Sequence, residues 1–165
     1  MQSEPRPVRA SQVEMTELVL PNDTNQLGNL LGGRLMHWID IAAALAAMRH
    51  SGRVCVTASV DGMSFLSAVK LGQVVTLKAS VNRVFRTSME VGVHVEMENP
   101  RTGTRVHANT AYLTFVGLSD EGTPVPAPQV IPESNDEIRR FAAAELRRAA
   151  RLESRKRIEE LERSR

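Results

Sequence analysis

The sequence predicts an α+β protein in which one antiparallel sheet wraps around a single long apolar helix, with a charged helix following it. Three observations lead to this prediction. Residues 38–48 are apolar except for Asp40, which is the composition of a buried helix. Later segments alternate apolar and polar residues with a period of two, which is typical of strands with one buried face. Residues 133–165 hold ten basic and eight acidic residues, which favours a second, solvated helix.

The expected elements follow one another with short connections. A first strand at 15–20 ends in Pro-Asn-Asp, which favours a turn. The helix occupies about 33–50 and stops at Ser-Gly. Four strands come next and bring the sheet to about five or six strands, the last two forming a hairpin: 54–61, 74–83, 89–98 and 105–116. In the segment 89–98, Val91 is expected to face inward and Glu90 outward.

The chain of 165 residues is long enough for one domain with a core and too short for two. We expect a flexible N-terminus at 1–13, one domain at 14–128 and a charged helical extension at 129–165. The prolines near residue 126 mark the end of the domain, because closely spaced prolines neither join a sheet nor continue a helix.

Composition argues against several classes of protein. The longest uncharged apolar run, 41–48, is too short to cross a bilayer, and 1–13 lacks the apolar core of a secretory signal, so a cytoplasmic protein that does not bind membranes is expected. A net charge of +2 gives no reason to expect nucleic acid. The four histidines lack ligand spacing, so no metal site is predicted.

Asp40 is the candidate catalytic residue. A carboxylate without a partner inside an apolar helix costs about 3–5 kcal/mol, so it needs either a specific partner or a chemical role. Residues 25–33 form a polar, glycine-bearing entry that leaves backbone N–H groups free near the helix start. An anion-stabilising helix start followed by a buried acid is the layout of an acyl-transfer site. The simpler alternatives are a salt-bridged core acid for Asp40 and a turn residue for Asn25.

Five motifs occur in order between residues 14 and 128: PNDTNQLG at 21–28, LGGR at 31–34, WID at 38–40, VTASVD at 56–61 and RTSMEV at 86–91. Together they resemble the acyl-coenzyme A thioesterases of the hotdog fold. The resemblance is to the branch of the YciA-like bacterial enzymes and the brain and cytosolic acyl-CoA hydrolases. It implies a hotdog fold and hydrolysis of an acyl-CoA to a free acid and coenzyme A.

The resemblance also implies which residues act. Asp40 would be the general base for water, or a nucleophile that passes through an anhydride. Asn25 would orient the water or the thioester carbonyl. Backbone N–H groups of Gly32 and Gly33 would stabilise the developing oxyanion.

The same resemblance assigns substrate contacts to two further segments. Thr57 would line the tunnel near the thioester. The turn that contains Arg86, Thr87 and Ser88 would contact the coenzyme, with Arg86 meeting a phosphate. The family more often has glycine where this chain has Phe85, which is a departure in the same turn.

Helix geometry adds a requirement for a second subunit. Asp40 lies seven residues beyond Gly33, about 10 Å along the helix axis, so we expect it to serve a carbonyl held by another subunit. In the family, dimers join sheets edge to edge, and each site takes the asparagine from one subunit and the aspartate from the other. We therefore expect at least a dimer, and a trimer of dimers as in many relatives. No metal or redox cofactor is expected, since coenzyme A is part of the substrate and product.

A second function remains open on the sequence alone. A non-catalytic acyl-CoA sensor would bind the same ligand and act through the charged C-terminal helix. The Arg-rich segments 147–151 and 155–157 are candidates for holding a phosphate-bearing ligand or RNA in that case. The simpler interpretation of this helix is a solvated element packed on its own domain or on a neighbouring subunit.

Overall fold

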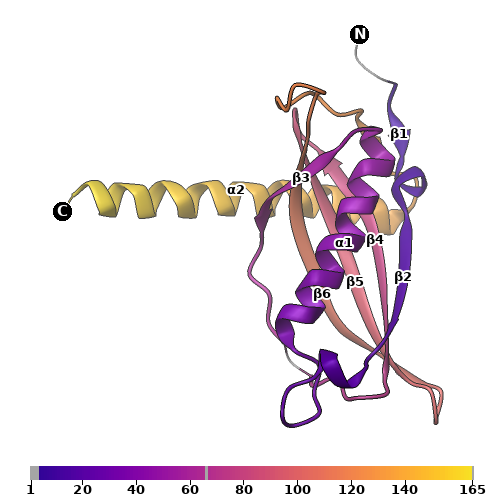
Figure 1. The fold of residues 1–165 in the computed structure, drawn as a ribbon. Coiled ribbons are helices and arrows are strands. Elements are labelled where there is room, and N and C mark those ends of the chain that lie inside the picture. The colour runs from indigo at the N-terminus through magenta and orange to yellow at the C-terminus, as the bar shows by residue number, and fades with distance from the viewer. Residues whose placement is uncertain (1–3, 66, 165) are drawn as a thin grey trace.

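The central feature is a curled antiparallel sheet of five strands with one helix on its inner face (Figure 1). The computed structural model describes residues 4–65 and 67–164. The strand order is β2-β4-β5-β6-β3, and the strands are β2 (Val13–Leu18), β3 (Cys55–Val60), β4 (Val74–Val84), β5 (Ser88–Asn99) and β6 (Thr104–Gly117). The helix on the inner face is α1 (Gly32–Ser51). The α+β prediction is confirmed, and element ends differ from the expected ones by one or two residues.

Alternation along the strands builds the core between the sheet and α1. Valines at alternate positions of β5, including Val91 and Val93, are fully buried. The helix offers alanines to this surface, which lets it lie close to the strands: Ala42, Ala43, Ala46 and Ala47. Gly52 closes the helix in the left-handed conformation at a φ of 68°.

The described residues that precede β2 do not form the flexible N-terminus that the sequence suggested. β1 (Arg6–Pro7) pairs in parallel with β7 (Val130–Ile131), and the 3-10 turn η1 (Val8–Ser11) follows it. Ser11 is fully buried, and its Oγ accepts a hydrogen bond from the Val81 backbone N–H at 2.9 Å. The expectation failed because two-residue strands carry no periodic signal, and their order comes from a partner more than 120 residues away.

The C-terminal helix α2 (Asn135–Arg163) crosses the outer face of the sheet and continues past β3 (Figure 1). It begins with a capping box, in which the backbone N–H of Glu137 donates to Ser134 Oγ at 3.2 Å and the Glu137 carboxylate accepts from the Ser134 N–H at 3.1 Å. Of its apolar residues, only Ala144 is fully buried. Charged contacts therefore hold much of this helix on the sheet.

Glu90 is the main anchor of α2. It points outward from β5 as expected, but only 1% of it is exposed, because α2 covers it. Arg147 donates to both carboxylate oxygens of Glu90, at 3.0 and 2.7 Å, and Asn82 donates a third hydrogen bond at 3.0 Å. Arg151 pairs with Asp61 at 2.9 Å. Glu90 therefore faces outward as expected but is buried beneath α2, and two arginines of the 147–151 segment form ion pairs within the chain.

Candidate active site

Asp40 lies on α1 and is half-buried rather than sealed in the core. The side of α1 that faces away from the sheet is open in the single chain and exposes Met36, Ile41 and Leu45. The expectation of a helix buried on every side is therefore wrong. A five-stranded sheet covers only one side of the helix, and an apolar composition does not reveal which side has a partner.

Thr57 on β3 is the hydrogen-bond partner of Asp40. Its Oγ1 donates to Asp40 Oδ1 at 2.7 Å. Asp40 Oδ2 forms no hydrogen bond within the described residues, and no lysine, arginine or histidine there pairs with the carboxylate. The carboxylate is thus oriented by one hydroxyl and retains an oxygen that can accept a proton.

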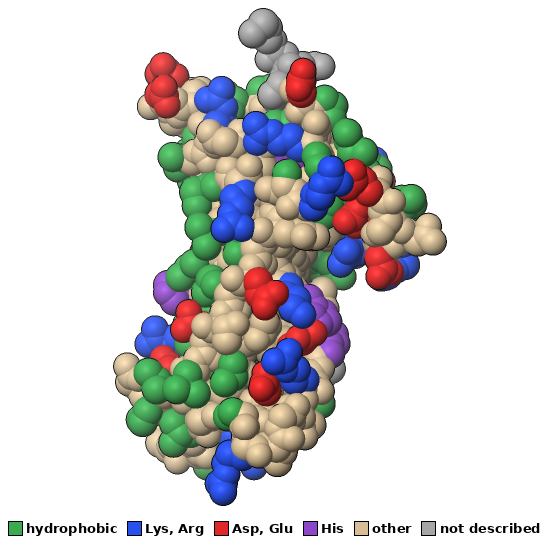
Figure 2. Space-filling model, turned by 90° about the vertical axis from the view of Figure 1, so that its right-hand side faces the viewer, with side chains coloured by type: hydrophobic (Ala, Val, Ile, Leu, Met, Phe, Trp, Pro, Cys, Tyr) green, Lys and Arg blue, Asp and Glu red, His purple; other side chains and the backbone are tan. Residues whose placement is uncertain are grey.

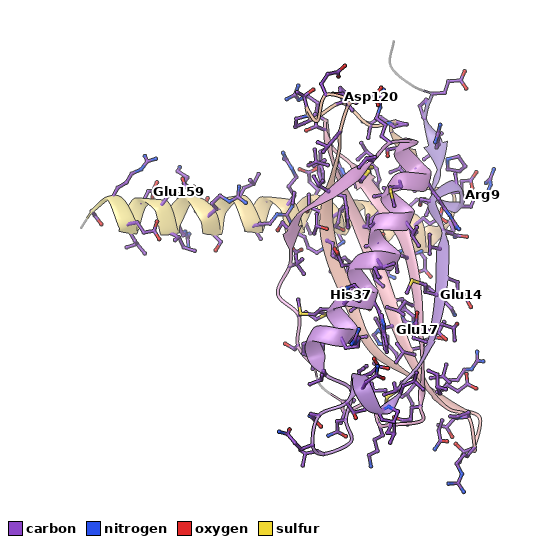
Figure 3. All side chains as sticks on the ribbon, viewed as in Figure 1. Arg9, Glu14, Glu17, His37, Asp120 and Glu159 are labelled. Atoms are coloured by element: carbon purple, nitrogen blue, oxygen red, sulfur yellow. The ribbon has the colours of Figure 1, made fainter. Side chains whose placement is uncertain are left out.

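A cavity of about 340 Å³ opens beside this pair. Its lining is mostly apolar and consists of Gly33, Met36, His37, Ile39, Asp40, Thr57, Val60, Met63 and Leu113. A mostly apolar pocket with a few convergent polar groups is the usual form of a small-molecule site. His37 was not among the expected site residues, although its spacing of three from Asp40 places both on one side of the helix. Figure 3 labels His37 on α1.

Asn25 holds its own loop together. Its Oδ1 accepts hydrogen bonds from the backbone N–H groups of Leu27, at 3.0 Å, and Asn29, at 3.1 Å. This is the turn role that the sequence left open as the simpler alternative. Both acceptor positions of the amide oxygen are used, while the NH₂ group forms no hydrogen bond within the part of the chain described. Asn25 can therefore still act as a donor.

The glycine segment forms the start of α1. Gly32 and Gly33 are its first two residues, and Leu31 at the N-cap provides no side-chain cap. The first N–H groups of a helix have no partner within the helix, so this end attracts negative charge. Buried Asp23 fixes the entry, since its carboxylate accepts from the Leu20 N–H at 3.0 Å and pairs with Arg34 at 3.1 Å.

Gly32 has a steric role as well. A Cβ built at Gly32 would lie 3.4 Å from the ring of Phe65, so glycine lets this aromatic side chain approach the helix start. Gly33 meets no such neighbour and lines the cavity beside Asp40. Of the two glycines, Gly33 is the one that adjoins the cavity.

The turn between β4 and β5 is closed by backbone bonds. The Phe85 N–H donates to the Ser88 carbonyl at 2.9 Å, and the Arg86 carbonyl accepts from Ala127 N–H at 3.2 Å. Arg148 of α2 lies over the Phe85 ring at 4.6 Å, so the residue that departs from the family pattern contacts the C-terminal helix. The Arg86 side chain is exposed and has no ion-pair partner among the described residues.

One chain does not bring all the expected site residues together. The Asn25 loop contacts the segment that precedes β4, since the Leu30 N–H donates to the Val69 carbonyl at 2.7 Å. Arg86 follows the other end of β4, whose 11 residues span about 35 Å. The cavity contains Asp40, Thr57 and Gly33, whereas Asn25, Gly32 and the turn residues Arg86, Thr87 and Ser88 lie outside its lining.

The described residues can also be compared with the requirements of a metal site, a membrane span and a basic patch. The described residues contain no group of three or more His, Cys, Asp or Glu side chains placed to bind a metal ion. Within those residues, no helix is long and apolar enough to cross a bilayer. On the side seen in Figure 2, basic and acidic side chains are interspersed rather than gathered into one patch.

An antiparallel sheet around an apolar helix, with a carboxylate beside an apolar cavity on the helix, defines a hotdog protein with a hydrolase-like site. The model of the thioesterase superfamily matches residues 27–104. An uncharacterized acyl-CoA thioester hydrolase of Bacillus subtilis, YkhA, is 43% identical over 154 residues, which cover 93% of this chain and 89% of the relative. The chain belongs to the acyl-CoA thioester hydrolases of the thioesterase superfamily, and it is an enzyme of that family.

Solved structures agree with this assignment. A hexameric acyl-CoA thioesterase in its apo form has a TM-score of 0.89 at 39% identity, covering 92% of this chain and 97% of the other. An acyl-CoA hydrolase from Staphylococcus aureus, solved with butyryl coenzyme A and coenzyme A, has a TM-score of 0.84 at 38% identity, covering 95% and 99%. The mammalian relatives are longer, and the chain spans between 20% and 37% of their length.

Proposed function

We propose that the protein hydrolyses acyl-CoA thioesters to a free carboxylic acid and coenzyme A. The observation that carries this proposal is the Asp40 carboxylate, which is held by Thr57 and has no cation partner within the described residues, beside an apolar cavity. An acid of this kind is suited to activate water against an acyl group that lies in the cavity. The reaction consumes only water and changes no oxidation state, so the proposal needs no redox cofactor, and it assigns the activation of water to Asp40 rather than to a metal ion.

The chemical step follows from these positions. Water attacks the thioester carbonyl carbon while Asp40 accepts its proton, and the C–S bond then breaks. The proton passes from Asp40 to the departing thiolate, which yields coenzyme A and the free acid. In the second form of the mechanism, Asp40 itself attacks the carbonyl carbon, and the C–S bond breaks to release the thiolate and leave a mixed anhydride. Water then hydrolyses the anhydride, which frees the acid and Asp40, and the proton released from water passes to the thiolate to give coenzyme A. Thr57 orients the carboxylate in both forms.

The oxyanion requires donors, and two sets are present. The backbone N–H groups at Gly32 and Gly33 lie at the positive end of α1. Asn25 supplies the second set through its NH₂ group, because its oxygen is already used by its own loop. Each donor aimed at a developing oxyanion is typically worth about 2.7–4 kcal/mol.

Relatives support the roles of Asn25, Asp40 and Thr57. The S. aureus acyl-CoA hydrolase has been solved as three single alanine variants, of one asparagine, one aspartate and one threonine. In that chain the asparagine precedes the aspartate by 15 residues, and the threonine follows it by 17. Asn25, Asp40 and Thr57 have the same separations.

We also propose that two chains share each site. The two edges of the sheet differ in character: β2 carries Glu14 and Glu17, labelled along this edge in Figure 3, whereas β3 has no charged residue and exposes Val56 and Val60. Charged side chains protect an edge strand from pairing, and an uncharged apolar edge invites it. Pairing at β3 would cover the open side of α1 and bring the Asn25 loop of a second copy toward Asp40.

This arrangement also gives the coenzyme a position. Arg86, Thr87 and Ser88 lie at the end of the sheet opposite the Asn25 loop, and an exposed guanidinium such as that of Arg86 suits a phosphate. A dimer would offer two such sites. Hexameric relatives make a trimer of dimers the assembly that we expect.

Turnover tests the proposal. Coenzyme A release is followed with a thiol reagent over a panel of acyl chain lengths, for the wild type and the Asp40→Ala variant. We expect the wild type to release thiol and the variant to lose about 10²–10⁴-fold in rate. A wild type that binds acyl-CoA but never releases thiol would contradict the proposal and favour the sensor. The internal pairing of Arg147 and Arg151 already weakens that alternative, because it removes two of the cations that the sensor would use.

A further inference from the structure

One face of α2 continues beyond the sheet that it covers. Six residues recur at alternating spacings of three and four, which places them along a single face of a helix: Ala144, Arg147, Arg151, Ser154, Ile158 and Leu161. The first three contact the chain's own sheet, through burial of Ala144 and the ion pairs of Arg147 and Arg151. The last three lie on the same face but beyond β3.

The second half of the helix, residues 152–163, projects past the β3 edge (Figure 1), and Glu159 in Figure 3 lies on this part. Twelve residues extend about 18 Å. Two large apolar side chains on the sheet-facing side are exposed here, Ile158 at 53% and Leu161 at 69%. These two side chains therefore form an apolar patch on the projecting half of the helix that the described residues leave more than half exposed.

A groove of about 700 Å³ separates this half of α2 from the end of β3. Ser59, Val60 and Asp61 form one wall, and Ser154, Arg155 and Ile158 form the other. One wall of the groove is thus the end of β3, which has no strand partner on its outer side within the described residues. The groove and the edge form one continuous surface.

We propose that residues 152–163 form a clasp, which lies over the outer face of the second copy of the chain that pairs at β3. Contacts with its own sheet hold α2 against the outer face of that sheet. A second chain that extends the sheet at β3 must therefore pass beneath the projecting half of the helix. The clasp has four basic and four acidic residues, and this balance suits a partner of mixed charge, such as another copy, better than nucleic acid. The inference rests on the dimer proposed above.

The clasp predicts that substitutions on the sheet-facing side of residues 152–163 weaken dimer assembly, whereas a substitution on another side of α2 does not. The variant Ile158→Glu/Leu161→Glu should raise the dissociation constant of the dimer by about tenfold or more in sedimentation experiments over a range of concentrations. Leu146→Glu is the matched control, because Leu146 is 72% exposed and is adjacent in sequence to Arg147, so it points away from the sheet. This control should leave the constant unchanged. Thermal unfolding checks that both variants retain the folded domain.

Hydrogen exchange gives a second, independent measurement. Amides of 152–163 should be protected in the wild-type dimer and exchange rapidly in the double variant. A dimer with unchanged affinity and rapid exchange at 152–163 would overturn the clasp and leave the dimer in place. A double variant that falls from hexamer to dimer, with its β3 amides still protected, would also overturn it, because the helix would then join dimers to each other. A wild-type monomer at all concentrations would overturn the shared site and the clasp together.

Discussion

Mixing Asp40→Ala chains with Asn25→Ala chains should restore activity that neither variant has. The Asn25 loop lies outside the lining of the Asp40 cavity in its own chain, so each complete site would take Asp40 from one copy and Asn25 from the other. A mixed dimer then contains one site with both residues and one site with neither. Random pairing makes half of the dimers mixed, and one of two sites in each is complete, so about a quarter of the wild-type activity per chain is expected.

The assay is coenzyme A release at saturating acyl-CoA, with the two variants co-expressed under different affinity tags. Each variant alone should lose about 10²-fold or more, since one lacks the base and the other an oxyanion donor. A mixture of Asp40→Ala with the double variant Asp40→Ala/Asn25→Ala is the matched control, because none of its dimers contains a complete site. If the tags show that mixed dimers form but activity stays at the level of this control, the two residues act within one chain and the shared site is wrong.

Three further changes test other contacts. Thr57→Val removes the 2.7 Å hydrogen bond to the Asp40 carboxylate and should lower kcat by about 10–100-fold, whereas KM should change little, as steady-state kinetics would show. Arg147→Met leaves the Glu90 carboxylate buried without its cation and should cost about 3–5 kcal/mol in denaturant unfolding, while Glu90→Gln in the same background should recover part of the loss. Burial lowers the pKa of His50 below its ordinary value of 6.5, so the unfolded chain binds the proton more readily and the free energy of unfolding should fall as the pH drops below 6.5. His50→Gln should flatten this slope in unfolding curves measured from pH 7.5 to 5, and an unchanged slope would show that other groups cause it.

The sequence predicted the local parts of this fold well. The alternation of β4 from Val75 to Val81 and of β5 from Met89 to Met97 is regular, and α1 is continuous, so each could be recognised within its own segment. Contacts between distant segments were not predictable in this way. Glu90 looks solvated within its strand and becomes buried only because a helix about 50 residues later lies on it. The pairing of β1 with β7 has the same origin.

The candidate site shows the same difference between local features, which the sequence predicts, and contacts with other parts of the molecule, which it does not. Asp40 was singled out because one acid interrupts an apolar helix, and Thr57 because it belongs to a motif; the structure places the two side chains in contact. The surroundings of Asp40 were misjudged, since the composition of a helix does not say which of its sides is covered by the same chain. Asn25 illustrates a further limit, because a turn role and a catalytic role are alternatives in the sequence. In the structure the amide oxygen serves the turn, which leaves the NH₂ group available for the proposed catalytic role.

The unlike edges of the sheet also bear on how a newly made chain avoids aggregation. An unpaired edge strand such as β3 can pair with any extended peptide, and a sheet with two such edges would add chains without limit and form fibrils. In the proposed dimer, growth would end after a single step, because two β3 edges would pair with each other and the glutamates of β2 would repel a third chain. The folded monomer is then the vulnerable species, and its lifetime falls as the chain becomes more abundant in the cell.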